Sequence, residues 1–545
     1  MKADGLASIA GIDEFRSRLS FGKSAWQIKA ECAARALADA GLDWQDVDAL
    51  YDCGEAGGMP GFPMAEYLGL HPSLIDNTAV GGSSFELHAA HADTALSAGR
   101  AQVALLTYGS TKRSGSYTAT DGLSAAPPIP SANMELRYGL TTPGAYAICA
   151  SRHMARYGTT AEQLAAVSVT ARAHALRNPD AVAGLAALRI KATELTAEMV
   201  LASPMIADPL HLLDCCLIND GGGAVVIVAP DLAADRPHPP VWIPGAGEAT
   251  RYLDNHDDIT VSAAVDSGRQ AFGQAGVRPG EIDVAMIYDS FTITVIVALE
   301  DLGFCAKGEG GAFADGGRLR FDEPGGPALN TDGGGLSSSD PGMRGIFLLI
   351  EATRQLRGTS TAQVPGARLA VSHGTGGWLT TRHVAGTVVL GGTSDGARRR
   401  GRAGRRGEPT AAEPRRTRHR RVLVRDGGRQ ADLPRLPPVR GGGLLPAVAL
   451  PGRPEPGPRS PGFGRSRNRV RVHRAPAQRR AQAPGTAAGR ARGRATQRGL
   501  PDAHGDRRRG SWRGPGRHAG SGALGGSRTK ACGSRCSNRT APRRV

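Results

Sequence analysis

The sequence predicts an α/β protein built from two copies of one folding unit, followed by a tail of different character. The first observation is an echo, because Ala40-Gly41 and Ala275-Gly276 lie 235 residues apart, each at a helix end before a strand. The second is a Gly-rich turn in each copy, at 81–84 and 333–337, followed by a helix and an apolar strand. The third is a change of composition near residue 393, past which the chain is strongly basic.

The helices and strands after these turns correspond in order. In the first copy we expect a helix over about 82–98 and a strand over 102–108. In the second copy we expect them over about 343–357 and 368–373. Continuous apolar strands that alternate with helices are typical of sheets buried on both faces. The alternative is a chance echo, which the matching offsets disfavour.

A long polar stretch follows the first copy's strand. Residues 109–143 are rich in Gly, Ser and Pro, and a connection of that length is usually a lid or a binding loop. Helices are expected over 161–175 and 194–203, and a strand over 224–228. We interpret the adjacent Cys215 and Cys216 as small core residues, because neighbours in a strand point to opposite faces.

The predicted boundaries are 1–235 for the first half, including the loop region 109–160, then 236–392 for the second half and 393–545 for the tail. From residue 397 onward the chain holds 39 basic and 7 acidic residues, whereas the preceding part has a net charge of −15. The tail has 38 arginines, one lysine and two aromatic residues, so it cannot build a core and we expect it to be disordered. A nucleic-acid-binding arm normally mixes Lys with Arg and adds aromatic residues. We therefore favour a frameshifted remnant over a nucleic-acid binder.

Several other classes are disfavoured by composition. The sequence has no run of 18 apolar residues that would predict a membrane span, and its first residues lack the apolar core of a signal peptide. The eight cysteines show no paired metal spacing, so we expect no metal site and a reducing, cytoplasmic location.

Six short motifs are spread in order through residues 8–391. They are Ala40-Gly41-Leu42 with Asp46-Val47-Asp48, the Gly81 turn, Ile218-Asn219-Asp220-Gly221-Gly222-Gly223, Tyr288-Asp289-Ser290-Phe291, Asn330-Thr331-Asp332-Gly333-Gly334 and His373-Gly374-Thr375-Gly376-Gly377. Together they resemble the thiolase superfamily, above all the sterol-carrier type often labelled lipid-transfer protein or acetyl-CoA acetyltransferase. The resemblance implies a duplicated α/β/α/β/α thiolase fold, a homodimer and acyl-CoA substrates, with coenzyme A as part of the substrate and no separate cofactor.

The chain departs from this pattern at the position of the nucleophile. Thiolases that run Claisen chemistry carry a cysteine at the start of the first-half helix, where the thiolate takes up the acyl group. Matching Gly82-Ser83 to the family's Gly-Ser places that position at Ala79. No cysteine lies between Cys53 and Cys149, so thiolysis is disfavoured whatever the alignment.

Five side chains are candidates for catalysis. Tyr288 stands where the family carries the Asn or His that helps to hold the thioester oxygen. Asp340 stands where the family usually carries the histidine of a His-Pro pair. Arg344 stands where the closest subgroup is expected to carry a tyrosine, and His373 opens a turn where the family has its second cysteine motif. Tyr252 is a second phenol near a turn. The structural alternatives are a helix cap for Asp340, a solvated Arg344, a turn role for His373 and strand-end positions for both tyrosines.

Two Gly-rich turns complete the candidate site. Gly81, Gly82 and Ser83 open the first-half helix, whose free backbone N–H groups can stabilise negative charge on a reacting carbonyl. Gly376 and Gly377 belong to the Gly-rich turn that His373 opens in the second half. Helix capping is the more conservative role for Ser83.

The residue set favours cleavage of a carbon–carbon bond by retro-aldol chemistry over cleavage by thiolysis. A related subgroup without the cysteine cleaves β-hydroxyacyl-CoA by retro-aldol chemistry in steroid side-chain degradation, together with a partner built from a zinc ribbon and an OB-fold. The open alternatives are an acetyl-CoA acyltransferase proper and an inactive scaffold that binds acyl-CoA or lipid.

Overall fold

The computed structural model describes residues 6–53, 61–115, 141–252, 258–323, 325–377, 379 and 382–392. The predicted tail over 393–545 and most of the polar stretch over 109–143 lie outside these residues. Among the described residues, no helix has both the length and the apolarity to cross a bilayer.

Each half contributes five strands in one order. The strand order across the whole sheet is β10-β9-β11-β12-β8-β1-β7-β4-β2-β3. Read outward from the centre, β1-β7-β4-β2-β3 repeats β8-β12-β11-β9-β10, with parallel and antiparallel pairs in the same places. The halves meet where Ser8 and Ile9 of β1 pair with Trp242 and Val241 of β8. The predicted duplication and the thiolase-type α/β fold are therefore confirmed.

The first half is formed by β1 (Ser8–Glu14), α1 (Ala25–Ala40), β2 (Ala49–Asp52), α2 (Gly61–Leu68), β3 (Leu74–Asp76), α3 (Ser84–Ser97), β4 (Val103–Ser110) and β7 (Gly221–Val228). The second half is formed by β8 (Val241–Arg251), α10 (Ala264–Ala275), β9 (Val284–Ile287), α11 (Thr292–Asp301), α12 (Gly310–Ala314), β10 (Ala328–Leu329), α13 (Gly334–Ser337), α14 (Gly345–Arg357), β11 (Leu369–Gly377) and β12 (His383–Gly391).

The echo between the halves has a local cause. Helices α1 and α10 end at Gly41 and Gly276, which adopt left-handed backbone with φ of 64° and 65°. This conformation is unfavourable for residues with a Cβ, so glycine terminates both helices.

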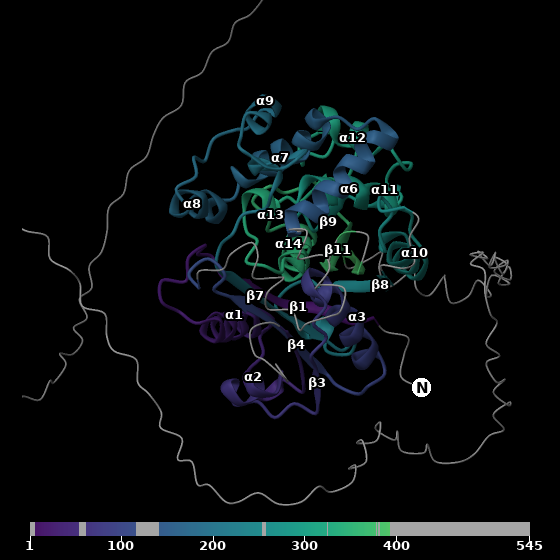
Figure 1. Cartoon of the computed structure of the whole chain (residues 1–545). Coiled ribbons are helices and arrows are strands. Elements are labelled where there is room, and N and C mark those ends of the chain that lie inside the picture. The colour runs from purple at the N-terminus through teal and green to yellow at the C-terminus, as the bar shows by residue number, and fades with distance from the viewer. Residues whose placement is uncertain are drawn as a thin grey trace, which may run out of the picture. The chain divides into compact units, whose positions relative to one another are not determined.

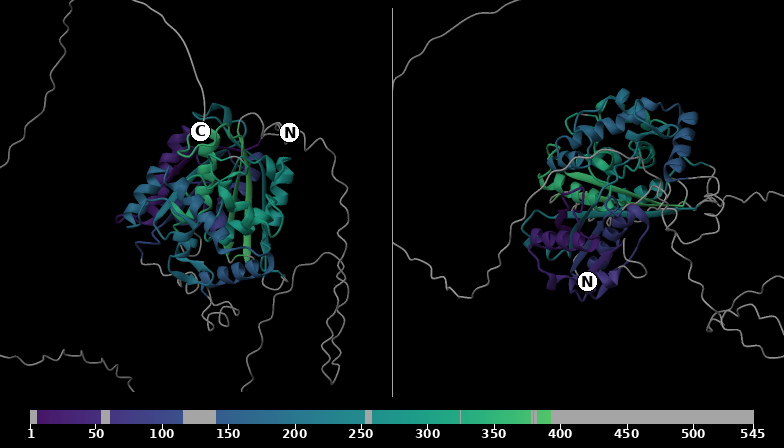
Figure 2. Two further views of the ribbon diagram at one scale, coloured as in Figure 1. Left: turned by 90° about the horizontal axis from the view of Figure 1, so that it is seen from above. Right: turned by 60° about the vertical axis from the view of Figure 1, so that its left-hand side comes forward.

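Helices α3 and α14 form the central layer. Each contacts strands of both halves, and their apolar faces share one buried cluster that includes Phe85, Phe347 and Ile350. In Figure 1 and in the right-hand view of Figure 2, α1 and α2 lie on one outer side and α10 to α12 on the other. The turns that open α3 and α14 are thereby brought to the middle of the protein.

An insertion of helices covers the second half. It comprises α6 (Thr142–Tyr157), α7 (Ala161–Ala175), α8 (Pro179–Ala187), α9 (Ala197–Leu201) and the hairpin β5 (Met205–Ala207) and β6 (Leu210–His211). Helix α7 has the predicted bounds, and Thr160 and Gln163 form a capping box at its start. Residues of this insertion form one wall of the cavity that contains the candidate site.

Candidate active site

A cavity of about 410 Å³ lies where the Gly-rich turns at 81–84 and 373–377, the end of β9 and the insertion meet. Its walls include the site candidates Gly82, Tyr288, Asp340 and Gly376, which come from four separate segments of the chain. The lining residues are Gly81, Gly82, Lys112, Thr142, Pro143, Tyr146, Ile206, Leu212, Cys215, Cys216, Ile218, Tyr288, Ser290, Phe291, Asp340, Gly342, Thr375, Gly376 and Gly377. The wall is apolar except for a few converging polar groups, as is usual in small-molecule sites.

Tyr288 stands at the centre of the polar part of this wall. It follows β9 directly, and its backbone N–H donates to the His373 carbonyl at 2.9 Å, which ties it to β11. The phenol lies 3.3 Å from the Gly342 carbonyl and 3.5 Å from Asp340 Oδ1. Burial, with the charge of Asp340 added, raises the pKa of Tyr288 well above its ordinary value. The phenol is therefore neutral at physiological pH and acts as a proton donor.

Asp340 brings a buried carboxylate into the cavity. Its Oδ1 accepts from the Gly342 N–H at 2.9 Å, and its own N–H donates to Asn219 Oδ1 at 2.7 Å. Its Oδ2 has no hydrogen-bond partner among the described residues. Because Arg344 rather than Asp340 is the N-cap of α14, the helix-cap alternative for Asp340 does not hold. A buried carboxylate oxygen that has no hydrogen-bond partner in the described part of the chain, beside a neutral phenol, can form an acid–base pair.

Gly82 is the position at the start of α3 that faces the cavity. A Cβ on Gly82 would lie 2.2 Å from Tyr288 Cε1 and 2.6 Å from the Thr375 carbonyl. Ala79, where the sequence placed the missing cysteine, is exposed and is not part of the cavity wall. The ring of Tyr288 fills the space that a side chain at residue 82 would need, so the turn before α3 offers no nucleophile to the cavity.

The other turn residues pack against each other. Gly81, with φ of 81°, has the Gly376 Cα 3.0 Å from the place of its missing Cβ. Gly377 also lines the cavity. Ser83 is fully buried and makes no side-chain cap bond, whereas Ser84 Oγ donates to the Gly81 carbonyl at 2.6 Å and accepts from Val80. Ser83 therefore does not have the expected capping role, and Ser84 Oγ instead holds the turn over residues 80–84 together.

Substituting Gly82 tests this contact. We expect Gly82→Ala to displace the Tyr288 ring, to lower the free energy of unfolding by about 1–3 kcal/mol and to reduce turnover. Gly280→Ala is the matched control, because a Cβ there meets nothing within 4 Å. Thermal unfolding and turnover of both variants check the prediction, and equal behaviour of the two would contradict it.

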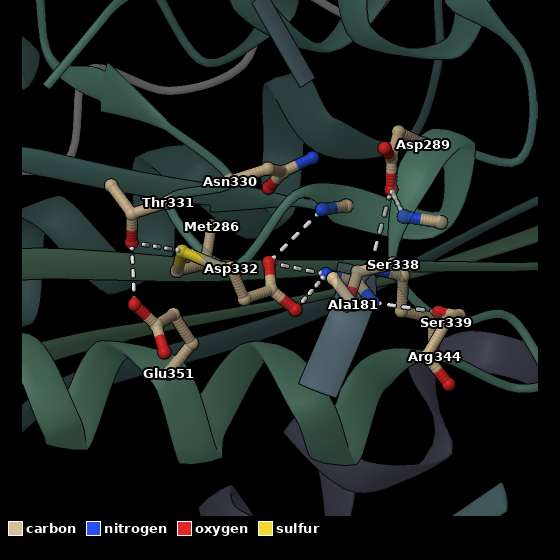
Figure 3. A network of polar contacts seen from close by, with 12 residues as sticks. Ala181, Met286, Asp289, Asn330, Thr331, Asp332, Ser338, Ser339, Arg344 and Glu351 are labelled. Carbon is tan, nitrogen blue, oxygen red and sulfur yellow. Dashed lines mark hydrogen bonds and ion pairs between the residues drawn. The ribbon is translucent and has the colours of Figure 1, made fainter. Parts of the chain in front are cut away.

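Arg344 is buried outside the cavity wall and is not solvated. Its Nε lies 3.2 Å from Asp289 Oδ1, its Nη2 contacts both oxygens of Asp332 at 2.6 and 2.7 Å, and its Nη1 donates to the Ser339 carbonyl. Figure 3 shows the guanidinium between these groups. A direct role in proton transfer is not supported, because its donors are directed at protein groups.

His373 and Tyr252 are likewise placed away from the reacting space. His373 is fully buried, its Nδ1 contacts Thr387 Oγ1 at 2.9 Å, and burial lowers its pKa to about 3, so it stays neutral. Tyr252 at the end of β8 is 58% exposed. Neither side chain belongs to the cavity wall. Their predicted catalytic roles find no support in this arrangement.

Four lining residues escaped the sequence analysis: Lys112, Tyr146, Cys215 and Cys216. Tyr146 stacks on Phe291 with ring centroids 4.4 Å apart and closes the apolar wall. The interpretation of the two cysteines as core residues is wrong, because both are only half-buried and line the cavity. They precede β7 in an irregular segment, where the alternation of a strand does not apply. Lys112 belongs to the stretch over 109–143 that was predicted to be a lid or binding loop, whereas no local pattern in the sequence indicated the other three.

The chain is similar in sequence and in structure to several known proteins. Residues 245–391 match the thiolase C-terminal domain-like family. The chain is 36% identical over 359 residues to an acetyl-CoA acetyltransferase of Methanothermobacter thermautotrophicus, covering 64% of this chain and 90% of the relative. It is 35% identical over 392 residues to a steroid side-chain-cleaving aldolase of Thermomonospora curvata, covering 68% and 96%. The solved Ltp2-ChsH2(DUF35) aldolase superposes with a TM-score of 0.63 at 32% identity, covering 71% and 98%.

Proposed function

Because this chain belongs to the thiolase superfamily, of the sterol-carrier-like type, we propose that it is an acyl-CoA enzyme that cleaves a carbon–carbon bond by retro-aldol chemistry. Its substrate is a β-hydroxyacyl-CoA thioester of lipid or steroid side-chain metabolism. The observation that carries this proposal is the Tyr288 phenol beside Asp340 in a cavity to which Ala79, the position matched to the family's cysteine, contributes no side chain. The similar aldolase supports retro-aldol cleavage, and the similar acetyl-CoA acetyltransferase supports the alternative, thiolysis.

The reaction follows from the roles of the two side chains. Asp340 Oδ2 takes the proton of the β-hydroxyl, and the oxygen's electron pair forms a carbonyl as the Cα–Cβ bond breaks. The bond electrons pass to Cα and the thioester carbonyl, which gives an enolate and releases an aldehyde or ketone. The neutral Tyr288 phenol protonates Cα, and Asp340 returns its proton to the phenolate. The products are a shortened acyl-CoA and a carbonyl compound.

The enolate oxygen needs hydrogen-bond donors aimed at it from a site with little water. The backbone N–H groups at the start of α3 are candidate donors, because the turn Gly81–Ser83 that leads into this helix lines the cavity at Gly81 and Gly82, and Lys112 adds a basic group to the same cavity. Phe291, Tyr146 and Pro143 supply apolar surface that excludes water. No acyl-enzyme forms, and no cofactor is required beyond the coenzyme A of the substrate.

Two substrates separate the candidate reactions. We expect the protein to convert a β-hydroxyacyl-CoA into a shorter acyl-CoA and a carbonyl product without added coenzyme A. Mass spectrometry of the reaction mixture detects both products. A β-ketoacyl-CoA with free coenzyme A should remain unchanged. Turnover of only the ketoacyl substrate would establish thiolysis instead, and binding without turnover of either would establish a scaffold.

Assembly is the second part of the proposal. The name of the similar solved aldolase includes a DUF35 protein. We propose that this chain forms a homodimer and that the homodimer binds a partner built from a zinc ribbon and an OB-fold. A cytoplasmic location fits the six free cysteines of the described residues. Co-expression with such a partner and size-exclusion chromatography should give a complex with two copies of this chain, and elution of a monomer alone would contradict it.

A further inference from the structure

Three buried arginines converge on three consecutive serines just before Asp340. Arg172 Nε donates to Ser337 Oγ at 3.0 Å, and Arg18 donates to the Ser338 carbonyl at 2.8 Å and to Ser338 Oγ at 3.2 Å. Arg344 donates to the Ser339 carbonyl at 2.7 Å. All three guanidinium side chains are at most 2% exposed.

The arginines come from three separate parts of the chain. Arg18 follows β1 of the first half, Arg172 lies in α7 of the insertion, and Arg344 immediately precedes α14 of the second half. The serine segment is therefore held from three directions. Asp340, the next residue, is additionally tied through its N–H to Asn219, whose amide also donates to Ser339 Oγ at 3.0 Å.

Three buried guanidinium groups are a poor source of net stability. Burying a guanidinium carries a penalty of several kcal/mol unless ion pairs and hydrogen bonds offset it. Arg18 pairs with Glu14 at 3.0 Å, and Arg344 pairs with Asp289 and Asp332. Arg172 forms no ion pair with any carboxylate of the described residues, and its remaining contacts are the Lys191 and Thr193 carbonyls. Because Arg172 is buried without a counter-ion among the residues that the structure describes, its contribution is better explained by the position that it gives to the contacted serine than by a gain in stability.

We propose that Arg18, Arg172 and Arg344 are positioning residues that hold the Ser337–Ser339 segment so that Asp340 stays beside the Tyr288 phenol. The inference rests on the proposed role of Asp340 as the base. The Asp340–Tyr288 separation is 3.5 Å, so a small shift of the segment breaks their contact. A misplacement of about 1 Å can cost on the order of a hundredfold in rate.

The test uses the Arg172–Ser337 contact, because it carries no charge pair. We expect Arg172→Lys and Ser337→Ala each to lower kcat by roughly tenfold or more while KM stays within about twofold. The double variant should be no worse than the worse single variant, since both remove one contact. The control is Arg357→Lys, because Arg357 is a buried arginine that pairs with Asp39 and does not touch the serines. The control should change kcat by less than about twofold.

A second readout does not depend on turnover. Cys216 faces the same cavity, and after burial the Asp340 carboxylate is the largest cause that raises the pKa of its thiol. If Asp340 moves away, iodoacetamide should alkylate Cys216 faster relative to Cys215 in Arg172→Lys and Ser337→Ala, measured by peptide mass spectrometry at pH 9.

The outcomes separate the two proposals. Absence of wild-type turnover of β-hydroxyacyl-CoA overturns the proposed function, and the alkylation ratio then still decides whether the arginines hold Asp340 in place. Wild-type turnover, with kcat and alkylation ratio of both variants equal to those of Arg357→Lys, overturns the positioning role. A loss confined to the yield of folded protein or to KM overturns it as well.

Discussion

Replacing Tyr288 by phenylalanine is expected to lower kcat for β-hydroxyacyl-CoA cleavage by roughly 10²–10⁴-fold, the usual worth of a positioned proton donor. The phenol oxygen is the side-chain group that lies beside Asp340 Oδ1, at 3.5 Å. Without it, the enolate carbon loses the proton donor that lies next to the base. KM should change little, because the ring and its apolar contacts remain.

The same substitution should leave the fold intact. The two contacts of the phenol are long, at 3.3 and 3.5 Å, so the free energy of unfolding should change by less than about 1 kcal/mol. Tyr67→Phe is the control, because Tyr67 in α2 is 52% exposed and lies outside the cavity wall. Turnover of Tyr288→Phe within threefold of the wild type would show that the proton comes from another group.

Replacing Glu86 by glutamine is expected to remove much of the pH dependence of stability between pH 5 and pH 8. Glu86 lies in α3 and is 1% exposed; Ser372 donates to its Oε1 at 2.8 Å, and its Oε2 has no partner among the described residues. Burial raises the pKa of Glu86 to about 8. The folded protein therefore binds this proton more tightly than the unfolded chain, in which the carboxyl has its ordinary pKa.

The sign of the effect follows from this difference. A carboxyl whose folded pKa is raised destabilises the fold progressively as pH rises from its unfolded to its folded pKa. This group alone should lower the wild-type free energy of unfolding by roughly 3–4 kcal/mol between pH 5 and pH 8. Glu86→Gln cannot ionise, so the stability of the variant relative to the wild type should increase with pH.

Denaturant unfolding at pH 5, 6.5 and 8 measures this directly. Glu66→Gln, at an exposed position of α2, is the matched control and should show no such trend. A stability difference between Glu86→Gln and the wild type that is constant across the three pH values would contradict a buried, neutral Glu86.

The sequence by itself determined the architecture of the described part of the chain. Helix-stopping glycines at 41 and 276, the turns at 81–84 and 333–337 and the apolar strands after them are local signals, readable over ten or twenty residues. Their repetition in the same order predicted the duplication that the sheet shows. The absence of a cysteine near the first turn also needed no structure.

Only the tertiary structure decided which side chains face the cavity. Gly82 rather than Ala79 points at Tyr288, Cys215 and Cys216 line the wall, and Arg344 lies inside the protein, joined to Asp289 and Asp332. Each of these outcomes depends on segments far apart in sequence that pack together, such as α3 against β11 and the serines against α7. Local periodicity carries no information about such contacts, because the direction of a side chain in a turn or irregular segment is set by what packs against it.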